Sequence, residues 1–240
     1  MTAYLITFLV MLAVFMLGCF LVKLPVSVSM LLAAVSGAIV SGNFNLELIR
    51  HLVEGEFSYV DTILTIATAM VFMKVVEFSG ALDALSSLII EKFHKVPAVL
   101  LILIMIVIMF PGMITGSSTA AVLSAGSIMA PVLILMGCDK ITAASIIAMG
   151  GLLGMTAPPT NLTAMIIGGG IDVPYSGFTG PLLLLTVPLA ILFPIMLGYK
   201  QVRGMNYEQL KPGLAEQDAT RKQYGIRIYL PIVVLVVLMV

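Results

Sequence analysis

The chain has 240 residues, of which 60% are hydrophobic and only 10% are charged, and its formal net charge is zero. Its mean hydropathy is +1.16, and a soluble domain of this length does not need so many apolar residues to build its core. This composition excludes a soluble protein and indicates an all-α membrane protein, and the chain has no basic tail or patch for nucleic acid.

The first 95 residues are predicted to form a scaffold of spans and interfacial helices. Tyr4–Val22 is long enough to cross a bilayer, and Lys23 and Pro25 end it. Spans and amphipathic, interfacial helices then alternate. In chain order these are the span Val26–Val40, the interfacial helix 44–57, the span Ser58–Phe78 and the interfacial helix 80–95.

Residues 97–136 are predicted to form a re-entrant hairpin. The first arm is wholly apolar, but it has only 14 residues before Pro111-Gly112. It would reach about 21 Å, which is short of a hydrocarbon core of roughly 30 Å. A polar tip, Thr115–Thr119, separates it from a second apolar arm. Irregular polar backbone at membrane depth needs protein or a water-filled cavity around it, and such interruptions point to the binding site of a secondary transporter.

A discontinuous span is predicted at 141–167, with a break at Met155–Asn161. Pro158 and Pro159 cannot continue a helix, and neither has an N–H donor. The unwound stretch frees carbonyl oxygens that suit Na⁺, and the helix after it offers its N-terminus to a carboxylate. Helix packing explains one such segment, but two of them, both rich in oxygen ligands, favour a binding site. The short oxygen ligands around the break are Thr156, Thr160, Asn161 and Thr163.

Residues 96–175 are therefore expected to form half of a transport domain, and 176–240 to complete the chain. The last part would hold a span at Gly177–Tyr199, a polar loop at 200–226 and the start of a further span near Ile226. Because that apolar run stops after about half the length of a span, we expect a fragment or half of a longer protein. Such a half-site alone is predicted neither to bind nor to transport substrate.

Lysine and arginine are unevenly distributed over the two predicted sides of the membrane. With the N-terminus outside, only Arg50 falls outside, beside three glutamates. The asymmetry predicts that orientation and a hairpin that opens toward the cytoplasm, although two complete spans would give the same parity. The residues on the inside are Lys23, Lys92, Lys95, Lys140, Lys200, Arg203, Lys211, Arg221, Lys222 and Arg227.

An enzyme is not indicated. Neither His51 nor His94 lies in a predicted span, and no two carboxylates face each other within one. A hydrolase in the membrane would need such groups or a metal cluster. The chain also lacks a Walker motif, so it does not itself use ATP.

Four motifs follow one another in a specific order and spacing, namely GMITGSSTA (112–120), GSIMAP (126–131), GGLLG (150–154) and APPT (157–160). In these motifs the chain resembles the large membrane subunit (DctM type) of tripartite ATP-independent periplasmic (TRAP) transporters, within the wider ion-transporter superfamily. It implies half of an inverted-repeat, elevator-type transporter in the bacterial inner membrane, with one re-entrant hairpin and one discontinuous transmembrane helix. It also implies Na⁺-driven uptake of small carboxylates, a small four-span membrane subunit, a periplasmic binding protein and no cofactor besides the coupling ion.

The resemblance implies that the hairpin tip and the break together form a Na⁺ site and half of a substrate cavity. One departure is the pair Thr160-Asn161, which resembles the Na⁺-binding loops of divalent-anion symporters. The predicted substrate ligands are Ser117, Ser118, Thr119, Thr160, Asn161 and Thr163. The predicted cation ligands are Thr115, Gly116, Ser118, Gly154, Thr156, Pro158 and Asn161.

Two alternative functions stay open at this point. The first is a stand-alone ion-coupled carboxylate symporter or antiporter that needs no binding protein. The second is a membrane scaffold or assembly subunit that transports nothing.

Overall fold

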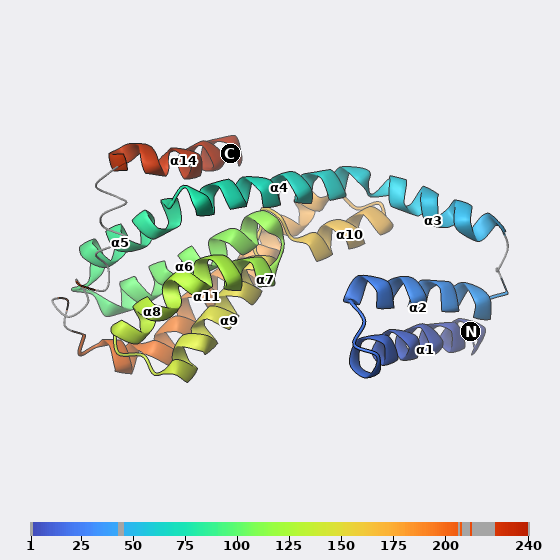
Figure 1. The fold of residues 1–240 in the computed structure, drawn as a ribbon, viewed down its shortest axis with the longest axis horizontal. Coiled ribbons are helices and arrows are strands. Elements are labelled where there is room, and N and C mark those ends of the chain that lie inside the picture. Colours follow the sequence, from blue (N-terminus) through green and yellow to red (C-terminus); the bar gives the residue numbers. More distant parts are fainter. Residues whose placement is uncertain (1, 43–45, 206, 208–211, 213–223, 240) are drawn as a thin grey trace. The chain divides into compact units, whose positions relative to one another are not determined.

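The computed structural model describes residues 2–42, 46–205, 207, 212 and 224–239. Over these residues the chain forms helices and no strand, which confirms the all-α class (Figure 1). The chain divides into two compact units, Met1–Val60 and Asp61–Val240. The predicted division into scaffold and transport parts stays a prediction.

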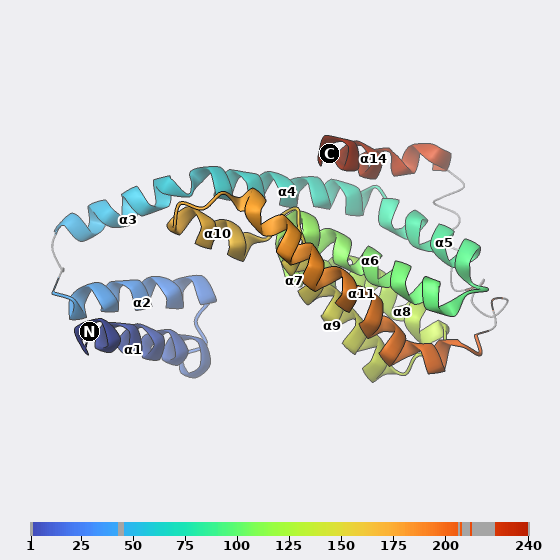
Figure 2. The same cartoon turned by 180° about the vertical axis from the view of Figure 1, so that it is seen from behind.

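The first unit begins with two helices that pack side by side (Figures 1 and 2). Glycine makes this contact close, because a Cβ on Gly18 would lie 2.7 Å from Ser29 Oγ, and one on Gly37 would lie 2.6 Å from Met11 Sδ. The second helix has the predicted bounds. The elements are α1 Thr2–Met16, the π-helical turn η1 Leu17–Leu21 and α2 Val26–Val40.

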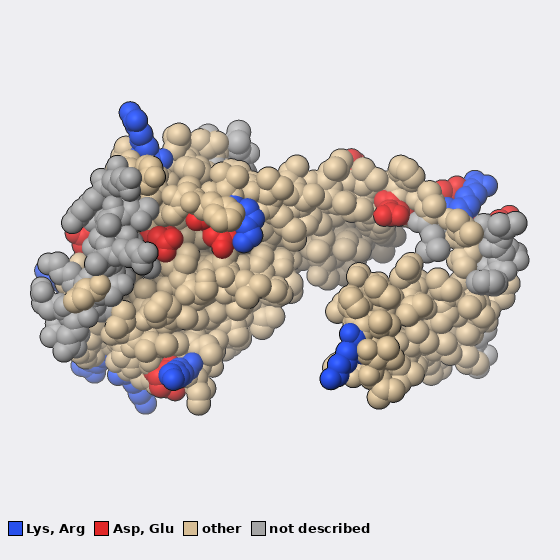
Figure 3. All heavy atoms as spheres, in the orientation of Figure 1, with Lys and Arg blue, Asp and Glu red and all other residues tan. Residues whose placement is uncertain are grey.

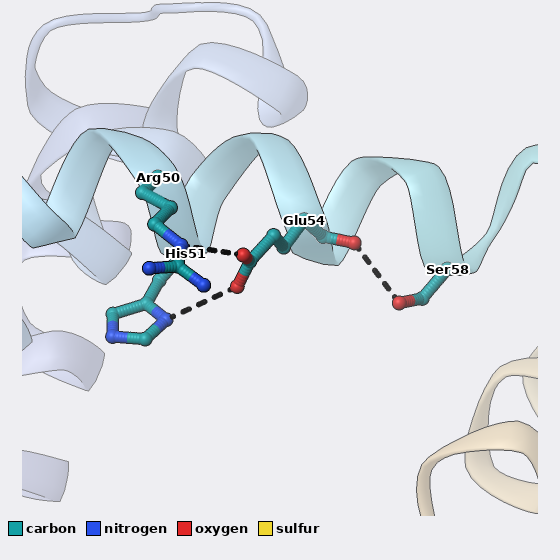
Figure 4. A network of polar contacts seen from close by, with 4 residues as sticks. All are labelled: Arg50, His51, Glu54 and Ser58. Carbon is teal, nitrogen blue, oxygen red and sulfur yellow. Dashed lines mark hydrogen bonds and ion pairs between the residues drawn. The ribbon is translucent and has the colours of Figure 1, made fainter.

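The third helix of this unit, α3 (Leu46–Ser58), carries a small network of polar contacts (Figure 4). Glu54 accepts a hydrogen bond from Arg50 Nε at 2.6 Å, and its other carboxylate oxygen lies 3.6 Å from His51 Nδ1. The hydroxyl of Ser58 donates to the Glu54 carbonyl at 2.9 Å. Such exposed pairs, one turn apart, stabilise a helix by only a few tenths of a kcal/mol (about 0.2–0.5). They mark the polar face of the predicted amphipathic helix, whose interfacial position stays a prediction.

The second unit is built around α6 (Pro97–Thr115), which packs against α5, α7, α9 and α11. Figures 1 and 2 both show α6, α9 and α11 lying side by side. The remaining elements are α4 Val60–Phe78, α5 Ala81–Phe93, α7 Ser118–Ala121, the π-helical turn η2 Val122–Gly126, α8 Ser127–Leu135, α9 Lys140–Thr156, α10 Leu162–Gly170, η3 Tyr175–Phe178, α11 Thr179–Val202, η5 Gly225–Tyr229 and α14 Leu230–Met239.

The core of this unit is apolar and closely packed. Leu101, Ile104 and Ile108 of α6 are buried against Leu133 of α8 and Ile146 of α9. Because α6 is apolar on every side, it can be surrounded by other helices. The hairpin and the discontinuous helix therefore share one core.

The predicted break at Pro111-Gly112 is wrong. Helix α6 continues through both residues to Thr115 and has 19 residues, which corresponds to about 28 Å. Proline removes one backbone donor, but the rest of the helix keeps its hydrogen bonds, and the Thr115 hydroxyl donates to the Pro111 carbonyl at 2.7 Å. The length of this arm therefore no longer argues for re-entry.

Helix α5 has the predicted amphipathic character, and its apolar face is covered by protein. Leu82 and Ile90 are fully buried, and α5 packs along α6. Burial against α6 therefore explains the amphipathic pattern without requiring a membrane surface.

Within the described residues, four helical segments are long and apolar enough to cross a membrane, or five if a bent pair is counted as one span. In Figure 3 most of the drawn surface carries no charge. Helix α4 carries Asp61, Lys74 and Glu77, and it passes this test only together with α3. Most of the predicted loop 200–226 lies outside the described residues. The four segments are Tyr4–Leu21, Pro97–Thr115, Ser118–Leu135 and Tyr175–Val202.

Candidate functional site

The hairpin turns in a short polar segment. Helix α6 ends at Thr115, and Gly116 follows in the left-handed region with φ 64°. Ser117 is extended, and its Oγ accepts a hydrogen bond from the Ala120 N–H at 3.3 Å. The Ser117 N–H donates in turn to Thr115 Oγ1 at 3.3 Å. Hydroxyl groups thus satisfy the backbone that the turn leaves without helical partners.

The break of the discontinuous helix lies at 157–161. Pro158 and Pro159 are joined by a cis peptide bond, and the backbone is extended at Ala157 and Asn161. Asn161 bridges the two half-helices, because its Oδ1 accepts from the Ala164 N–H at 3.0 Å and its Nδ2 donates to the Thr156 carbonyl at 2.8 Å. The sequence placed this break correctly, although α9 ends two residues later and α10 three residues later than predicted.

The two interrupted segments meet through Thr160. Its N–H donates to the Met113 carbonyl at 3.2 Å. Its hydroxyl donates to the Ile114 carbonyl at 2.7 Å and also lies against the Met113 carbonyl. These carbonyls belong to the last turn of α6, where no helical N–H reaches them. Thr160 therefore ties the break directly to the hairpin.

Glycines make this junction close. A Cβ on Gly116 would lie 3.1 Å from Leu162 Cβ, and one on Gly154 would lie 2.5 Å from the Met109 carbonyl oxygen. A Cβ on Gly112 would lie 2.9 Å from the Gly154 carbonyl carbon. Backbone meets backbone here, so no larger residue fits without displacing a helix.

Several of the predicted ligands already use their hydroxyl groups in hydrogen bonds within the protein. The hydroxyls of Thr115, Thr156 and Thr160 each donate to a backbone carbonyl. A hydroxyl that has used its only hydrogen offers lone pairs alone, which suits a cation better than a carboxylate. The predicted role of Thr160 as a substrate donor would require this hydrogen bond to break, and it stays a prediction.

Of the other predicted ligands, some pack at the junction and some are exposed. Gly116 meets the break, and Ser118 lies beside α9, because a Cβ on Gly151 would be 3.1 Å from the Ser118 carbonyl oxygen. Asn161 and Pro158 are buried at the break, and Asn161 is 6% exposed. The remaining two ligands, Thr119 and Thr163, are exposed.

Sequence reasoning missed Tyr175. Its hydroxyl oxygen accepts a hydrogen bond from the Asn161 N–H at 2.9 Å, and its ring stacks on Phe178. Tyr175 lies in η3, after the end of α10, and reaches back over the whole half-helix. Only the preceding Pro174, which marks a turn, hints in the sequence that the chain reverses here.

The base of the hairpin is fixed by a second polar cluster. Gln201 Nε2 donates to Asp139 Oδ1 at 2.7 Å, and Gln201 Oε1 accepts from the Asp139 N–H at 3.0 Å. Hydrogen bonds from Thr142 and Gln201 lower the pKa of the Asp139 carboxyl. Burial, and to a lesser degree the charge of Asp139, raise the pKa of the neighbouring Cys138 thiol to about 11. Asp139 and Gln201 thereby join the start of α9 to the end of α11.

Neither interrupted segment contains a carboxylate, and among the described residues no three His, Cys, Asp or Glu side chains form a group that could hold a metal ion. The oxygen atoms at the junction are therefore those of hydroxyl, carbonyl and amide groups. This set matches a weakly bound monovalent cation better than Ca²⁺, which usually recruits Asp or Glu.

Several span-capable helices, together with a helical hairpin and a discontinuous helix that share a polar junction, are typical of a multi-pass membrane protein. The sequence model of the family described as "Tripartite ATP-independent periplasmic transporter, DctM component" matches residues 9–239, and the chain belongs to this family. The protein is thus a membrane component of a transporter and not a member of an enzyme family. Comparisons with curated proteins and with solved structures returned no match.

Proposed function

We propose that this chain is the transmembrane subunit of a Na⁺-coupled importer of small carboxylates in a bacterial inner membrane. A small membrane subunit and a periplasmic binding protein that delivers the substrate would complete the tripartite system. The observation that carries the proposal is the Thr160 bridge between the two interrupted segments. It gathers hydroxyl and carbonyl oxygens around one junction, in a part of the chain without acidic side chains.

The coupling ion is assigned to this junction. Thr115 and Thr156 present oxygen lone pairs, and Ser118 lies at the start of the returning arm. Na⁺ prefers hard oxygen ligands and needs little fixed negative charge, and unwound backbone in transporters coordinates Na⁺ in this way. The exposed Thr119 and Thr163 are proposed to bind the substrate, as the sequence predicts.

Uptake by the complete transporter in proteoliposomes tests this function. Labelled pyruvate, succinate and malate would be offered with and without a Na⁺ gradient and with and without the binding protein. Ser118→Ala and Thr156→Val should each raise the Na⁺ concentration for half-maximal uptake about fivefold, which corresponds to about 1 kcal/mol for a lost ligand. Ser145→Ala removes a comparable hydroxyl near the other end of α9 and should change nothing. Unchanged Na⁺ dependence in both site variants would remove the ion from this junction.

Dependence on the binding protein separates the proposal from a stand-alone symporter or antiporter. Uptake that is equally fast without the binding protein would favour the stand-alone transporter. Absence of uptake of all three carboxylates under a Na⁺ gradient would contradict the proposal.

We further infer that the hairpin is re-entrant from the cytoplasmic side and that the N-terminus lies outside. The polar tip and the distribution of basic residues support this topology. Cysteines at the exposed Lys95 and Lys140 should react with an impermeant maleimide from the inside only. A cysteine at the exposed Thr119 should not react from the outside, whereas it would do so if α6 and α8 were complete spans. Cys138 is unsuited to this experiment because it is buried.

A further inference from the structure

A cavity of about 200 Å³ lies between α4 and the flank of the hairpin tip. Most of its lining is apolar. Its charged groups are those of Lys74 and Glu77, whose Nζ and Oε2 atoms are 2.8 Å apart. The lining residues are Met70, Met73, Lys74 and Glu77 from α4, and Thr115, Ala120, Leu123 and Ser124 from the hairpin.

Packing of α4 brings this ion pair to the hairpin. Met73 and Val76 are buried in a cluster with Ile114 and Ala125 of the hairpin. Lys74 and Glu77 follow them by one residue each, so they lie beside the buried stripe and border the cavity. The apolar contacts of α4 therefore place the backbone of Lys74 at the edge of the cavity, and its side chain is 65% exposed.

The hydroxyls of the cavity are already engaged. Thr115 donates to the Pro111 carbonyl at 2.7 Å, and Ser124 donates to the Ala120 carbonyl at 2.6 Å. Within the cavity lining, Glu77 is the only anionic partner of Lys74. The hairpin itself has no Lys or Arg between Val96 and Cys138, so Lys74 brings to it a positive charge that its own sequence lacks.

We propose that this cavity binds a small carboxylate, with Lys74 as its cationic ligand and Glu77 as the internal counter-ion that the carboxylate displaces. The choice of a carboxylate rests on the proposed transport function. The ammonium group borders an apolar cavity, and the Lys74 side chain is 65% exposed whereas that of Glu77 is 28% exposed, so an anion can reach Lys74 from the cavity. Glu77 neutralises Lys74 in the empty cavity, and the arriving carboxylate takes over its hydrogen bonds.

The proposal predicts opposite effects for the two members of the pair. Glu77→Gln should strengthen carboxylate binding, because Lys74 then has no competing partner. Lys74→Gln should abolish binding, and Lys74→Arg should keep it. A pair that only stabilises the helix would instead show the same direction of change in Lys74→Gln and Glu77→Gln.

A cysteine at Leu123 measures the cavity directly. Leu123 lines it and is 69% exposed, and Cys19 and Cys138 would be replaced by alanine in the full chain. The local charge is reported by the ratio of two modification rates, the rate with an anionic methanethiosulfonate divided by the rate with a cationic one. This ratio should fall about threefold to tenfold in Lys74→Gln and rise in Glu77→Gln. A cysteine at the exposed Ile141, at the hairpin base, is the matched control and should show no change.

Protection experiments then test the ligand. Pyruvate, succinate or malate should slow the reaction of the Leu123 cysteine with N-ethylmaleimide, more strongly in Glu77→Gln and not at all in Lys74→Gln. The neutral succinamide should give no protection. Absence of protection by all three acids, or protection that survives Lys74→Gln, would overturn the proposal. Protection without Na⁺-driven uptake would leave this site standing and remove the proposed function, whereas uptake without protection would remove this site alone.

Discussion

The hydroxyl of Thr160 donates a hydrogen bond to the carbonyl oxygen of Ile114, which lies 46 residues earlier in the chain. This contact joins the last turn of α6 to the break between α9 and α10. It replaces the helical partners that the end of α6 lacks, and it draws the proline break against the hairpin.

Thr160→Val should destabilise the protein. Valine keeps the shape of threonine, but it leaves the buried carbonyl of Ile114 without its hydroxyl donor, which costs about 1–3 kcal/mol. We expect a lower midpoint of thermal unfolding in detergent. Thr163→Val, at an exposed position three residues later, is the control and should leave the midpoint unchanged. Equal midpoints for the wild type and Thr160→Val would show that this bond contributes nothing to stability.

Gly154→Ala should be more damaging than its small size suggests. The added Cβ would lie 2.5 Å from the Met109 carbonyl oxygen, so α6 and α9 would have to separate. Overpacking of this kind costs about 1–3 kcal/mol. The matched control is Gly180→Ala in α11, where a Cβ has no heavy atom within 4 Å. The control should be neutral or slightly stabilising, and a well-folded Gly154→Ala of unchanged midpoint would contradict the packing described here.

Tyr175→Phe should loosen the break without unfolding the unit. It removes the oxygen that accepts from the Asn161 N–H and keeps the ring that stacks on Phe178. Hydrogen exchange measured by mass spectrometry should become faster in peptides that cover 157–165. Tyr224→Phe, at an exposed position, is the control. If exchange in this segment is the same in both variants, the tyrosine does not hold the break.

Cys138 should react slowly with maleimides at neutral pH. Its side chain is 3% exposed, and its thiol pKa of about 11 leaves only about one thiol in several thousand ionised near pH 7.5. In a Cys19→Ser background, the rate should rise about tenfold per pH unit between pH 7 and 9. Asp139→Asn removes the charge that disfavours the thiolate, so it should lower the thiol pKa and accelerate labelling. A rate that is independent of pH would show that access, and not ionisation, controls the reaction.

The sequence predicted most of the helices, because apolar runs and proline breaks are local signals. The bounds of α2 were correct, and the break near Pro158-Pro159 was found to within two residues. The failure at Pro111 is instructive. A single proline costs one hydrogen bond, and in an apolar environment the helix is still the conformation that satisfies the remaining backbone.

The sequence indicated which two segments form the candidate site, but it did not predict which of their residues contact one another. Local residue types identified the tip and the break, yet nothing local shows that Thr160 faces Ile114 or that Tyr175 reaches Asn161. These pairings depend on how α6 and α9 pack, and the close approach of the two helices depends on Gly112 of α6 and on Gly150 and Gly154 of α9. The position of Lys74 beside the hairpin could not be predicted for the same reason, because the two are remote in sequence.

Helix α9 is held at both ends, by the Asp139–Gln201 pair to α11 at its N-terminus and by Thr160 to α6 just beyond its C-terminus. It cannot slide along α11 without breaking the first contact or along α6 without breaking the second. The places where the chain can bend are therefore the connections that lead into this bundle. Gly80, which turns the chain between α4 and α5 with φ 71°, is such a connection, and it adjoins the ion pair of α4. Because Met73 and Val76 of α4 pack in one cluster with Ile114, a shift of α4 about Gly80 would act both on the Lys74 cavity and on the hydrogen bond between Thr160 and Ile114.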